Sequence, residues 1–422
     1  MMQFDRRRGS FVVGGVNILA VLLLASAIIT AEAQAQWTQY GGPGQSFTAE
    51  STGLAKEWPA QGPPKLWSRT LGEGHSSILA DDGRLYTMYR VGNEERAICL
   101  DAATGSTLWE YGYESSPAEG HNSDYGNGPN STPLLADARL YAIGIAGVMH
   151  CLDAGNGKEL WSRNLWSDFG ANHELFGYSS SPIEYKDTVI TLVGGPERSI
   201  VAFNKSDGSI AWKNLSFDNS YSTPKVLKIH GKDQLVVFMG SEAIGTDPNN
   251  GELKWRYPIE NRWKQNITAP VLGDDNTLFV SSLLVGSRGL KLAGNADKTD
   301  VEEIWTTEKI QIFFSSAVRI GDYVYACTGK QGGFFLACVN IPTGKIVWRK
   351  RGFGRSHVVY ADGYLIILDE DGNLGLATAT PDDLTVHSKF KPLERPSWTP
   401  PTIVGKTLYL RDQHKIMALD LG

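Results

Sequence analysis

Two short stretches of this sequence carry residue pairs that could perform chemistry. His121 lies close to Asp124, and His173 is followed directly by Glu174. An imidazole and a carboxylate can together ligate a metal ion, or they can act as base and acid in proton transfer. The same residue types are common in solvated loops, so the alternative is that both pairs are ordinary polar loop residues. Both pairs are therefore candidates for a site, without a catalytic role assigned to any of them.

Familiar sequence signatures of catalysis do not occur in the chain. There is no nucleophile-elbow motif, no glycine-rich phosphate loop and no H-E-x-x-H pattern. The cysteines show no zinc or iron–sulfur spacing. With 40 basic and 46 acidic residues the charge is nearly balanced, so a nucleic-acid-binding surface is not expected. These observations favour a protein without catalytic activity, but they leave open whether it is an enzyme.

A ten-residue frame recurs along the chain and organises it. The frame is an apolar residue, Asp or Asn, three variable residues, Gly, three more residues and Trp. Complete copies occupy 100–109, 152–161, 203–212 and 339–348, and a copy at 246–255 differs mainly in its first residue. So specific a frame, repeated this often, marks a structural repeat. The repeat residues are Asp101, Gly105, Trp109, Asp153, Gly157, Trp161, Gly208, Trp212, Gly251, Trp255, Gly344 and Trp348, with Trp305 in a unit that has lost the rest of the frame.

The frame has a physical interpretation as a β-hairpin followed by an outer strand. The Asp or Asn side chain can accept hydrogen bonds from backbone N–H groups two residues further on. The Gly supplies the positive φ that the reversal needs. The Trp is a large apolar body that suits the gap between adjacent sheets. We therefore expect the frame Trp residues to be mostly buried between neighbouring sheets.

The units between the frames have the length of four-stranded blades. Most begin at a Ser/Thr-rich tripeptide such as Ser131-Thr132-Pro133, and frame Trp residues recur at the interval of about 40–50 residues typical of blade repeats. The last unit, Thr399–Leu421, stops after its third strand, whereas Lys65–Thr70 matches an outer strand without a unit of its own. The sequence predicts an all-β fold, an eight-bladed β-propeller of four-stranded antiparallel blades, closed by this N-terminal outer strand. A linear solenoid is the alternative, and the orphan strand argues against it.

The N-terminal region divides into two segments ahead of the propeller. Residues 1–35 contain a basic cluster, an apolar run and two A-x-A patterns, which predict a signal peptide; an uncleaved membrane anchor is the alternative. Residues 36–63 are expected to form an extended lead-in packed on the surface, and 64–422 to form the propeller. Three of the cysteines share one repeat position, which favours free buried thiols; the remaining alternative is a bridge between the last two. The cysteines are Cys99, Cys151, Cys327 and Cys338.

The longest departures from the repeat are loops that lead into innermost strands. The loops at 114–129, 165–178 and 260–264 should lie on one face around the central axis. Aromatic, Arg and His side chains in such loops suit contacts with a partner, although the loops could instead only plug the axial channel. The candidate binding residues on this face are His121, Asp124, His173, Glu174, Tyr178, Arg262, Trp263, Lys264, Arg355 and His357.

The frame resembles the pyrroloquinoline-quinone-type (PQQ-type) propeller repeat, A-x-D-x-x-T-G-x-x-x-W. Quinoprotein dehydrogenases share this repeat with the BamB-type subunit of the outer-membrane β-barrel assembly machine. The likeness covers nearly all of residues 37–422, and the segments 37–43, 177–182 and 408–413 look like those of exported bacterial propellers of mostly unknown function. The resemblance therefore implies the fold more strongly than it implies a function.

The resemblance implies three possible functions. The first is a non-catalytic scaffold in the periplasm or another envelope compartment. It would bind envelope or outer-membrane proteins as a monomer and contact membrane only through an uncleaved N-terminus or a partner. The second is a PQQ- and calcium-dependent oxidoreductase, but the adjacent cysteines and the catalytic Asp of those enzymes have no match here, so no cofactor is expected. The third is a carbohydrate-binding or carbohydrate-modifying propeller, to which the loop aromatics Trp166, Phe169 and Trp263 point.

Overall fold

The computed structural model describes residues 36–422 except 172, 296–297 and 331–332. The signal peptide or anchor predicted for residues 1–35 lies outside the described residues. The chain separates into two units, Met1–Ala33 and Gln34–Gly422, and the propeller lies within the second. None of the helices among the described residues is long and apolar enough to cross a membrane.

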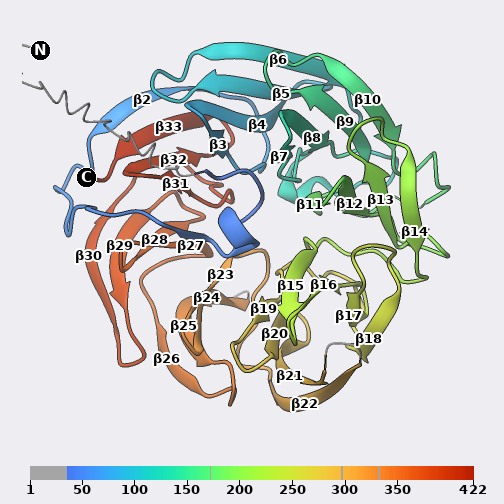
Figure 1. The fold of residues 1–422 in the computed structure, drawn as a ribbon. Coiled ribbons are helices and arrows are strands. Elements are labelled where there is room, and N and C mark those ends of the chain that lie inside the picture. Colours follow the sequence, from blue (N-terminus) through green and yellow to red (C-terminus); the bar gives the residue numbers. More distant parts are fainter. Residues whose placement is uncertain (1–35, 172, 296–297, 331–332) are drawn as a thin grey trace, which may run out of the picture. The chain divides into compact units, whose positions relative to one another are not determined.

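Eight antiparallel sheets, as far as the described residues show, surround a central axis like the blades of a propeller (Figure 1). This confirms the fold predicted from the frame. Blades 1 to 4 contain β3 (Leu79–Asp81), β4 (Arg84–Val91), β5 (Glu94–Asp101), β6 (Thr107–Glu114); β7 (Leu134–Ala136), β8 (Arg139–Ile143), β9 (Val148–Asp153), β10 (Glu159–Asn164); β11 (Ile183–Tyr185), β12 (Thr188–Leu192), β13 (Ile200–Asn204), β14 (Ile210–Asn214); and β15 (Lys225–Ile229), β16 (Lys232–Phe238), β17 (Glu242–Thr246), β18 (Leu253–Pro258).

The second half of the ring repeats the same order, with the innermost strand first in each blade. Blades 5 to 8 contain β19 (Val271–Leu272), β20 (Thr277–Ser282), β21 (Gly286–Gly294), β22 (Thr299–Thr307); β23 (Ala317–Ile320), β24 (Tyr323–Lys330), β25 (Gly333–Asn340), β26 (Ile346–Lys350); β27 (Ser356–Ala361), β28 (Tyr364–Asp369), β29 (Leu374–Ala379), β30 (Leu384–Phe390); and β31 (Thr402–Val404), β32 (Thr407–Arg411), β33 (Lys415–Asp420) with β2 (Lys65–Thr70).

The N-terminal strand closes the ring as predicted. Strand β2 pairs antiparallel with β33, with Lys65 opposite Leu419 and Thr70 opposite Lys415. The eighth blade therefore joins the two ends of the propeller, and β33 does not end the sheet as an exposed edge. Figure 1 shows the blue β2 lying outside the red β33.

The frame residues hold neighbouring blades together. The indole of Trp109 in blade 1 lies on Gly157 in blade 2, where a Cβ atom would come within 2.5 Å of the ring. The φ of Gly157 is 76°, so this position needs glycine for its backbone as well as for the close approach. The Nε1–H of Trp109 donates to the carbonyl of Ala154 at 2.9 Å. The same Trp-on-Gly contact joins Trp67 to Gly105, Trp161 to Gly208, Trp212 to Gly251 and Trp305 to Gly344.

The burial of the frame Trp residues is less uniform than predicted. Trp109, Trp255 and Trp348 are buried, whereas Trp161, Trp212 and Trp305 are only partly buried. Trp255 faces a blade whose frame is lost, and its Nε1–H donates to Gln234 of its own blade at 2.8 Å instead. Trp255 still packs against the next blade, in an apolar cluster with Leu278 and Leu290 of blade 5.

The lead-in crosses the ring instead of lying only on its outer surface, contrary to our expectation. Its residue Trp37 forms a bridge with Ala80 of blade 1. After η1 (Pro43–Gln45), strand β1 (Thr48–Ala49) runs parallel to β27 of blade 7. Gln45, the last residue of η1, donates its Nε2–H to the carbonyl of Pro224, at the start of blade 4, at 3.0 Å. The reason is burial: the lead-in places apolar side chains against the inner ends of the blades, and Figure 1 shows its blue ribbon inside the ring.

The four cysteines are buried and free, in line with the preference for separate core thiols. Cys327 lies opposite Leu336 and Cys338 lies opposite Tyr325 in the pairing of β24 with β25. The two are thus on neighbouring strands without facing each other directly.

Candidate functional site

The loops that lead into the innermost strands gather at one end of the central channel, which we call the loop face. The N–H of Asn122 in the loop at 114–129 donates to the carbonyl of Leu175 at 2.8 Å. The N–H of Phe176 in the loop at 165–178 donates to the hydroxyl of Tyr221 at 3.3 Å. Tyr221 in turn donates its N–H to Asn266, just beyond the loop at 260–264. The three longest loops are therefore parts of one connected surface.

Hydrogen bonds from backbone N–H groups to side-chain hydroxyls link blades 1 to 4 along the channel. The N–H of Ser77 in blade 1 donates to the hydroxyl of Thr132 in blade 2 at 3.1 Å. The N–H of Thr132 donates to Ser181 of blade 3 at 3.0 Å, and the N–H of Ser181 donates to Thr223 of blade 4 at 3.2 Å. In blades 2 to 4 one hydroxyl of each Ser/Thr-rich tripeptide therefore accepts a backbone N–H from the preceding blade, whereas Thr268 at the start of blade 5 donates to the carbonyl of Phe313 at 2.8 Å.

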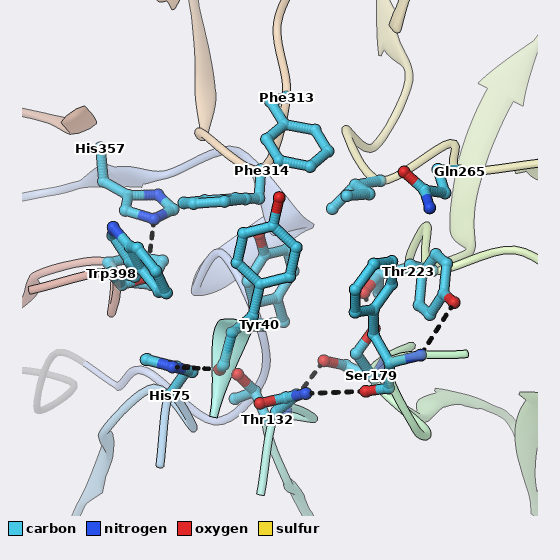
Figure 2. A pocket seen from close by; sticks show the side chains of 17 residues that line it. Tyr40, His75, Thr132, Ser179, Thr223, Gln265, Phe313, Phe314, His357 and Trp398 are labelled. Carbon is cyan, nitrogen blue, oxygen red and sulfur yellow. Dashed lines mark hydrogen bonds between the residues drawn. The ribbon is translucent and has the colours of Figure 1, made fainter. Parts of the chain in front are cut away.

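The channel holds a cavity of about 130 Å³ at this level, which we call the channel cavity. Figure 2 shows two different sides, with Phe313, Phe314, His357 and Trp398 on one and Thr132, Ser179, Thr223 and Gln265 on the other. The lining residues are Tyr40, His75, Tyr125, Asn130, Thr132, Phe176, Ser179, Ser181, Tyr221, Thr223, Gln265, Ile267, Phe313, Phe314, His357, Trp398 and Pro400.

Aromatic rings in mutual contact form one wall of the channel cavity. The ring of Tyr125, from the loop at 114–129, is 5.0 Å from Phe176 and 5.7 Å from Trp398 between centroids. Phe314 is 4.9 Å from Phe313 and 5.2 Å from Trp398. These edge-to-face and tilted arrangements are the favourable geometries for aromatic pairs, so the wall is an ordered surface.

Two histidines of this wall, the buried His357 and the half-buried His75, are neutral at physiological pH. Burial lowers the pKa of His357 to about 4. Its Nδ1 accepts the N–H of Ser316 at 3.1 Å, and its Nε2–H donates to the carbonyl of Trp398 at 2.8 Å. Burial, together with the positive charge of Arg411, also lowers the pKa of His75 to about 4. Because both nitrogens of His357 are occupied, this ring is a poor base and a poor metal ligand in its present position.

The His–acid pairs of the sequence do not form pairs in the structure. His121 contacts the carbonyl of Gly126 through Nε2 at 3.2 Å, whereas Asp124 is exposed. The ring of His173 packs edge-on against Trp166, 4.1 Å away between centroids. Within the described part of the chain, no group of three or more His, Cys, Asp or Glu side chains is arranged to hold a metal ion.

Three further candidate residues, Tyr178, Arg355 and Glu174, lie in different surroundings from one another. Tyr178 is buried, and its hydroxyl donates to the carbonyl of Leu192 at 3.0 Å, which is a packing role. The guanidinium of Arg355 lies over the ring of Phe314, 4.7 Å from its centroid. Burial raises the pKa of Glu174 to about 7, with a smaller opposing effect from a hydrogen bond to Asn219. Among the candidate binding residues predicted from the sequence, His357 lines the channel cavity and the others do not.

A second hollow, of about 310 Å³, lies on the loop face, and we call it the Trp263 depression. Trp263 is 57 % exposed and Leu175 is 47 % exposed. Lys264 Nζ pairs with Asp218 Oδ2 at 2.6 Å beside it. The depression is lined by Glu174, Leu175, Tyr221, Arg262, Trp263, Lys264 and Gln265, so it brings together four of the residues proposed from the sequence.

Most of the residues that line the channel cavity were not among the candidate binding residues predicted from the sequence. The available signal was position: His75, Phe314 and Trp398 each stand directly before a blade-opening Ser/Thr segment. Such residues reach the axis because the innermost strand begins immediately after them. Tyr40 gave no comparable signal, since it arrives from the lead-in.

The fold and the frame define a propeller of the PQQ-like repeat class. A family model described as outer membrane protein assembly factor BamB matches residues 58–190 and 93–311, and the chain belongs to this family. BamB of Salmonella typhimurium is 24 % identical over 313 residues, which cover 70 % of this chain and 76 % of that protein. The quinohemoprotein alcohol dehydrogenase ADH IIB of Pseudomonas putida is 25 % identical over 221 residues, 49 % of this chain and 31 % of that protein.

Solved structures of both kinds share the fold. Quinohemoprotein alcohol dehydrogenase from Comamonas testosteroni superposes with a TM-score of 0.71 at 12 % identity, covering 93 % of this chain and 82 % of that one. BamB from Moraxella catarrhalis superposes with a TM-score of 0.58 at 15 % identity, covering 84 % of this chain and 97 % of that one. At these identities the comparisons establish the architecture, a BamB-like propeller.

The channel cavity fits PQQ with calcium poorly. Calcium takes six to eight oxygen ligands, among which carboxylates are prominent. The described residues that line the cavity include no Asp, Glu, Lys or Arg. They therefore offer neither a carboxylate for calcium nor a cation for an acidic quinone, although their hydroxyl and amide groups can hold an uncharged ligand.

Proposed function

We propose that this protein is a non-catalytic propeller of the cell envelope that binds another protein on its loop face, with no bound quinone. The observation that carries the proposal is Trp263, which stands 57 % exposed at the edge of a depression. Trp and Arg are enriched among residues that dominate binding energy, and Arg262 lies beside Trp263. A large aromatic ring left in water on a rigid ring of blades is suited to a partner that covers it.

Charge at the depression favours a partner with mixed polarity. Lys264 and Asp218 form an exposed ion pair next to Trp263, and Arg262 adds a cation. Apolar contacts at Trp263 and Leu175 would supply most of the affinity, while the surrounding charges would set orientation and association rate.

The family supports the place of action and the kind of partner. Relatives in this family are named outer membrane protein assembly factors. Together with the signal peptide predicted for residues 1–35, this supports a periplasmic or other envelope location and an envelope or outer-membrane protein as partner. In this proposal the chain works as a monomer, and it contacts membrane only through an uncleaved N-terminus or through its partner.

The proposal is tested by matched substitutions and recovery of partners. Trp263→Ala combined with Arg262→Ala should lower the recovery of co-purified outer-membrane proteins about tenfold or more, because losing a hot spot costs about 2 kcal/mol or more. Leu175→Ser should also lower it, whereas Leu108→Ser should not. Leu108 is the matched control, since it is 49 % exposed on outer strand β6, away from the loop face. Equal recovery for all variants would refute the proposal.

The quinoprotein alternative has one observation in its favour, the TM-score of 0.71 with a quinohemoprotein alcohol dehydrogenase. Against it stands the uncharged lining of the channel cavity, as far as its residues are described. Titration with PQQ and calcium chloride separates the two. The proposed function predicts an unchanged melting temperature and no dye-linked alcohol oxidation, and a rise in melting temperature with oxidation would establish the alternative.

A further inference from the structure

We propose that the channel cavity is a second binding site, independent of the protein-binding surface, for a single neutral sugar ring. It lies within the channel, whereas the Trp263 depression lies on the loop face, and the two share Tyr221 and Gln265 among the described residues that line them. The inference does not depend on the proposed function.

The walls of the channel cavity match the two faces of a pyranose. A sugar ring has C–H groups that pack on aromatic rings and hydroxyl groups around its edge that donate and accept hydrogen bonds. Phe314 and Trp398 provide an aromatic surface, while Thr132, Thr223 and Gln265 provide polar groups elsewhere around the cavity (Figure 2). The rings of Phe176 and Tyr221, 6.1 Å apart, add a second aromatic surface. A purely aromatic ligand would leave the polar groups of the cavity without partners, which is costly for buried polar groups.

Several polar groups at the cavity have unused hydrogen-bonding capacity. The hydroxyls of Thr132, Ser181 and Thr223 each accept a backbone N–H, so each has its own hydrogen left to donate. Among the described residues, the Tyr40 hydroxyl and the Gln265 amide have no hydrogen-bond partner. The buried Oδ1 of Asn130 likewise lacks one. Donors and acceptors are thus both available, as a sugar requires.

The size of the channel cavity limits the ligand to about one ring. Its volume of about 130 Å³ is close to the roughly 150 Å³ of an engineered cavity that accommodates benzene, so the cavity takes one ring, and the substituents of a sugar extend through its open side. The cavity is partly open, so a second sugar unit could extend outward. A single ring held by a few hydrogen bonds should bind weakly, with a dissociation constant on the order of 1 mM.

The electrostatics of the lining favour an uncharged sugar. No Asp, Glu, Lys or Arg occurs among the described residues that line the cavity. Burial lowers the pKa of His75 and His357 to about 4, so both are neutral near pH 7. Arg355 stacks on Phe314 without lining the cavity itself. An acidic sugar would therefore lose hydration without gaining an opposite charge.

The test is a titration of the full protein with four single-ring probes, followed by saturation-transfer NMR and tryptophan fluorescence. Methyl β-D-glucopyranoside and methyl N-acetyl-β-D-glucosaminide represent neutral sugars, glucuronate an acidic one, and p-cresol an aromatic side chain. We expect saturable binding of at least one neutral glycoside, weaker binding of glucuronate, and no tighter binding of p-cresol.

Two substitutions connect binding to this cavity. Tyr40→Phe and Gln265→Leu each remove a polar group without a protein partner, so each should leave the melting temperature unchanged or higher while weakening glycoside binding about fivefold. Tyr364→Phe, in β28 and outside the lining, is the matched control and should bind like wild type. Trp263→Ala should also leave glycoside binding intact, even if it abolishes partner binding.

Three results would overturn the inference. The first is the absence of saturable binding for both neutral glycosides at tens of millimolar. The second is equal affinity of Tyr40→Phe, Gln265→Leu and wild type for the glycoside. The third is tighter binding of p-cresol than of either glycoside, which would assign the cavity to an aromatic side chain of a partner.

Discussion

The contact between Trp109 and Gly157 should be one of the stabilising links between blades 1 and 2. Trp109 is 8 % exposed, packs on Gly157 and donates to the carbonyl of Ala154. Replacing a buried Trp by Ala typically costs about 3–5 kcal/mol, part of it here from leaving that carbonyl without its partner. For roughly 360 residues unfolding together, about 4 kcal/mol corresponds to a fall of about 5 °C in melting temperature.

Gly157→Ala is the second single variant of a double-mutant cycle with Trp109→Ala. Its Cβ would lie 2.5 Å from the Trp109 ring, and the residue would have to keep a φ of 76°. The positive φ alone costs an alanine about 1–2 kcal/mol, and the collision adds to this. Once Trp109→Ala has removed the ring, only the backbone cost should remain. The double variant should therefore be less destabilised than the sum of the single variants, by about 2 kcal/mol.

The assay is urea unfolding followed by far-ultraviolet circular dichroism, because Trp fluorescence would change with the substitution itself. Trp263→Ala is the matched control, since the same substitution at an exposed site should change the free energy of unfolding by less than about 1 kcal/mol. Additivity of Trp109→Ala and Gly157→Ala within about 0.5 kcal/mol would refute the contact as the link between the blades.

Three further predictions concern pH and ring closure. In the folded state the pKa of His75 and His357 is about 4, below the ordinary 6.5, so the unfolded chain binds more protons between these values. Stability should fall from pH 6.5 towards pH 4 by up to about 3 kcal/mol per histidine, and His357→Gln should flatten this fall in urea midpoints. Lys225 is buried, which lowers its pKa from 10.5 to about 8. Lys225→Met should raise stability at pH 7 by about 1–3 kcal/mol, and the difference from wild type should disappear as pH rises towards 10.5. Deleting residues up to Thr70 removes β2 from β33, so the product should melt lower and self-associate on size exclusion; a monomer of unchanged melting temperature would contradict the closure.

The sequence predicted the blades because their signals are local. Each Asp–Gly turn and each frame Trp has its meaning within one repeat, and the orphan Lys65–Thr70 matched the one unit that lacked an outer strand. The path of the lead-in could not be predicted in this way. Gln45 bonds to Pro224, far along the chain, and no periodic pattern relates such residues.

The grouping of the channel-cavity residues could not be predicted for a related reason, although the positions of some of them before blade starts were visible in the sequence. Tyr125, Phe314 and Trp398 come from three distant loops, and they meet only because ring closure brings the blade starts to one axis. The pairs at His121 and His173 illustrate the opposite error. His173 and Glu174 are neighbours in the sequence, which suggested a shared chemical role. In the structure the ring of His173 packs against Trp166 instead.

The most direct test of the loop-face proposal is site-specific photo-crosslinking in the living cell. A photoreactive amino acid is placed at Trp263, at Leu175 or at the control position Leu108, whose exposure of 49 % matches the 47 % of Leu175. The proposal predicts that positions 263 and 175 give an adduct with the same envelope or outer-membrane protein and that position 108 does not. Adducts that are absent from positions 263 and 175, or identical at all three positions, would contradict it.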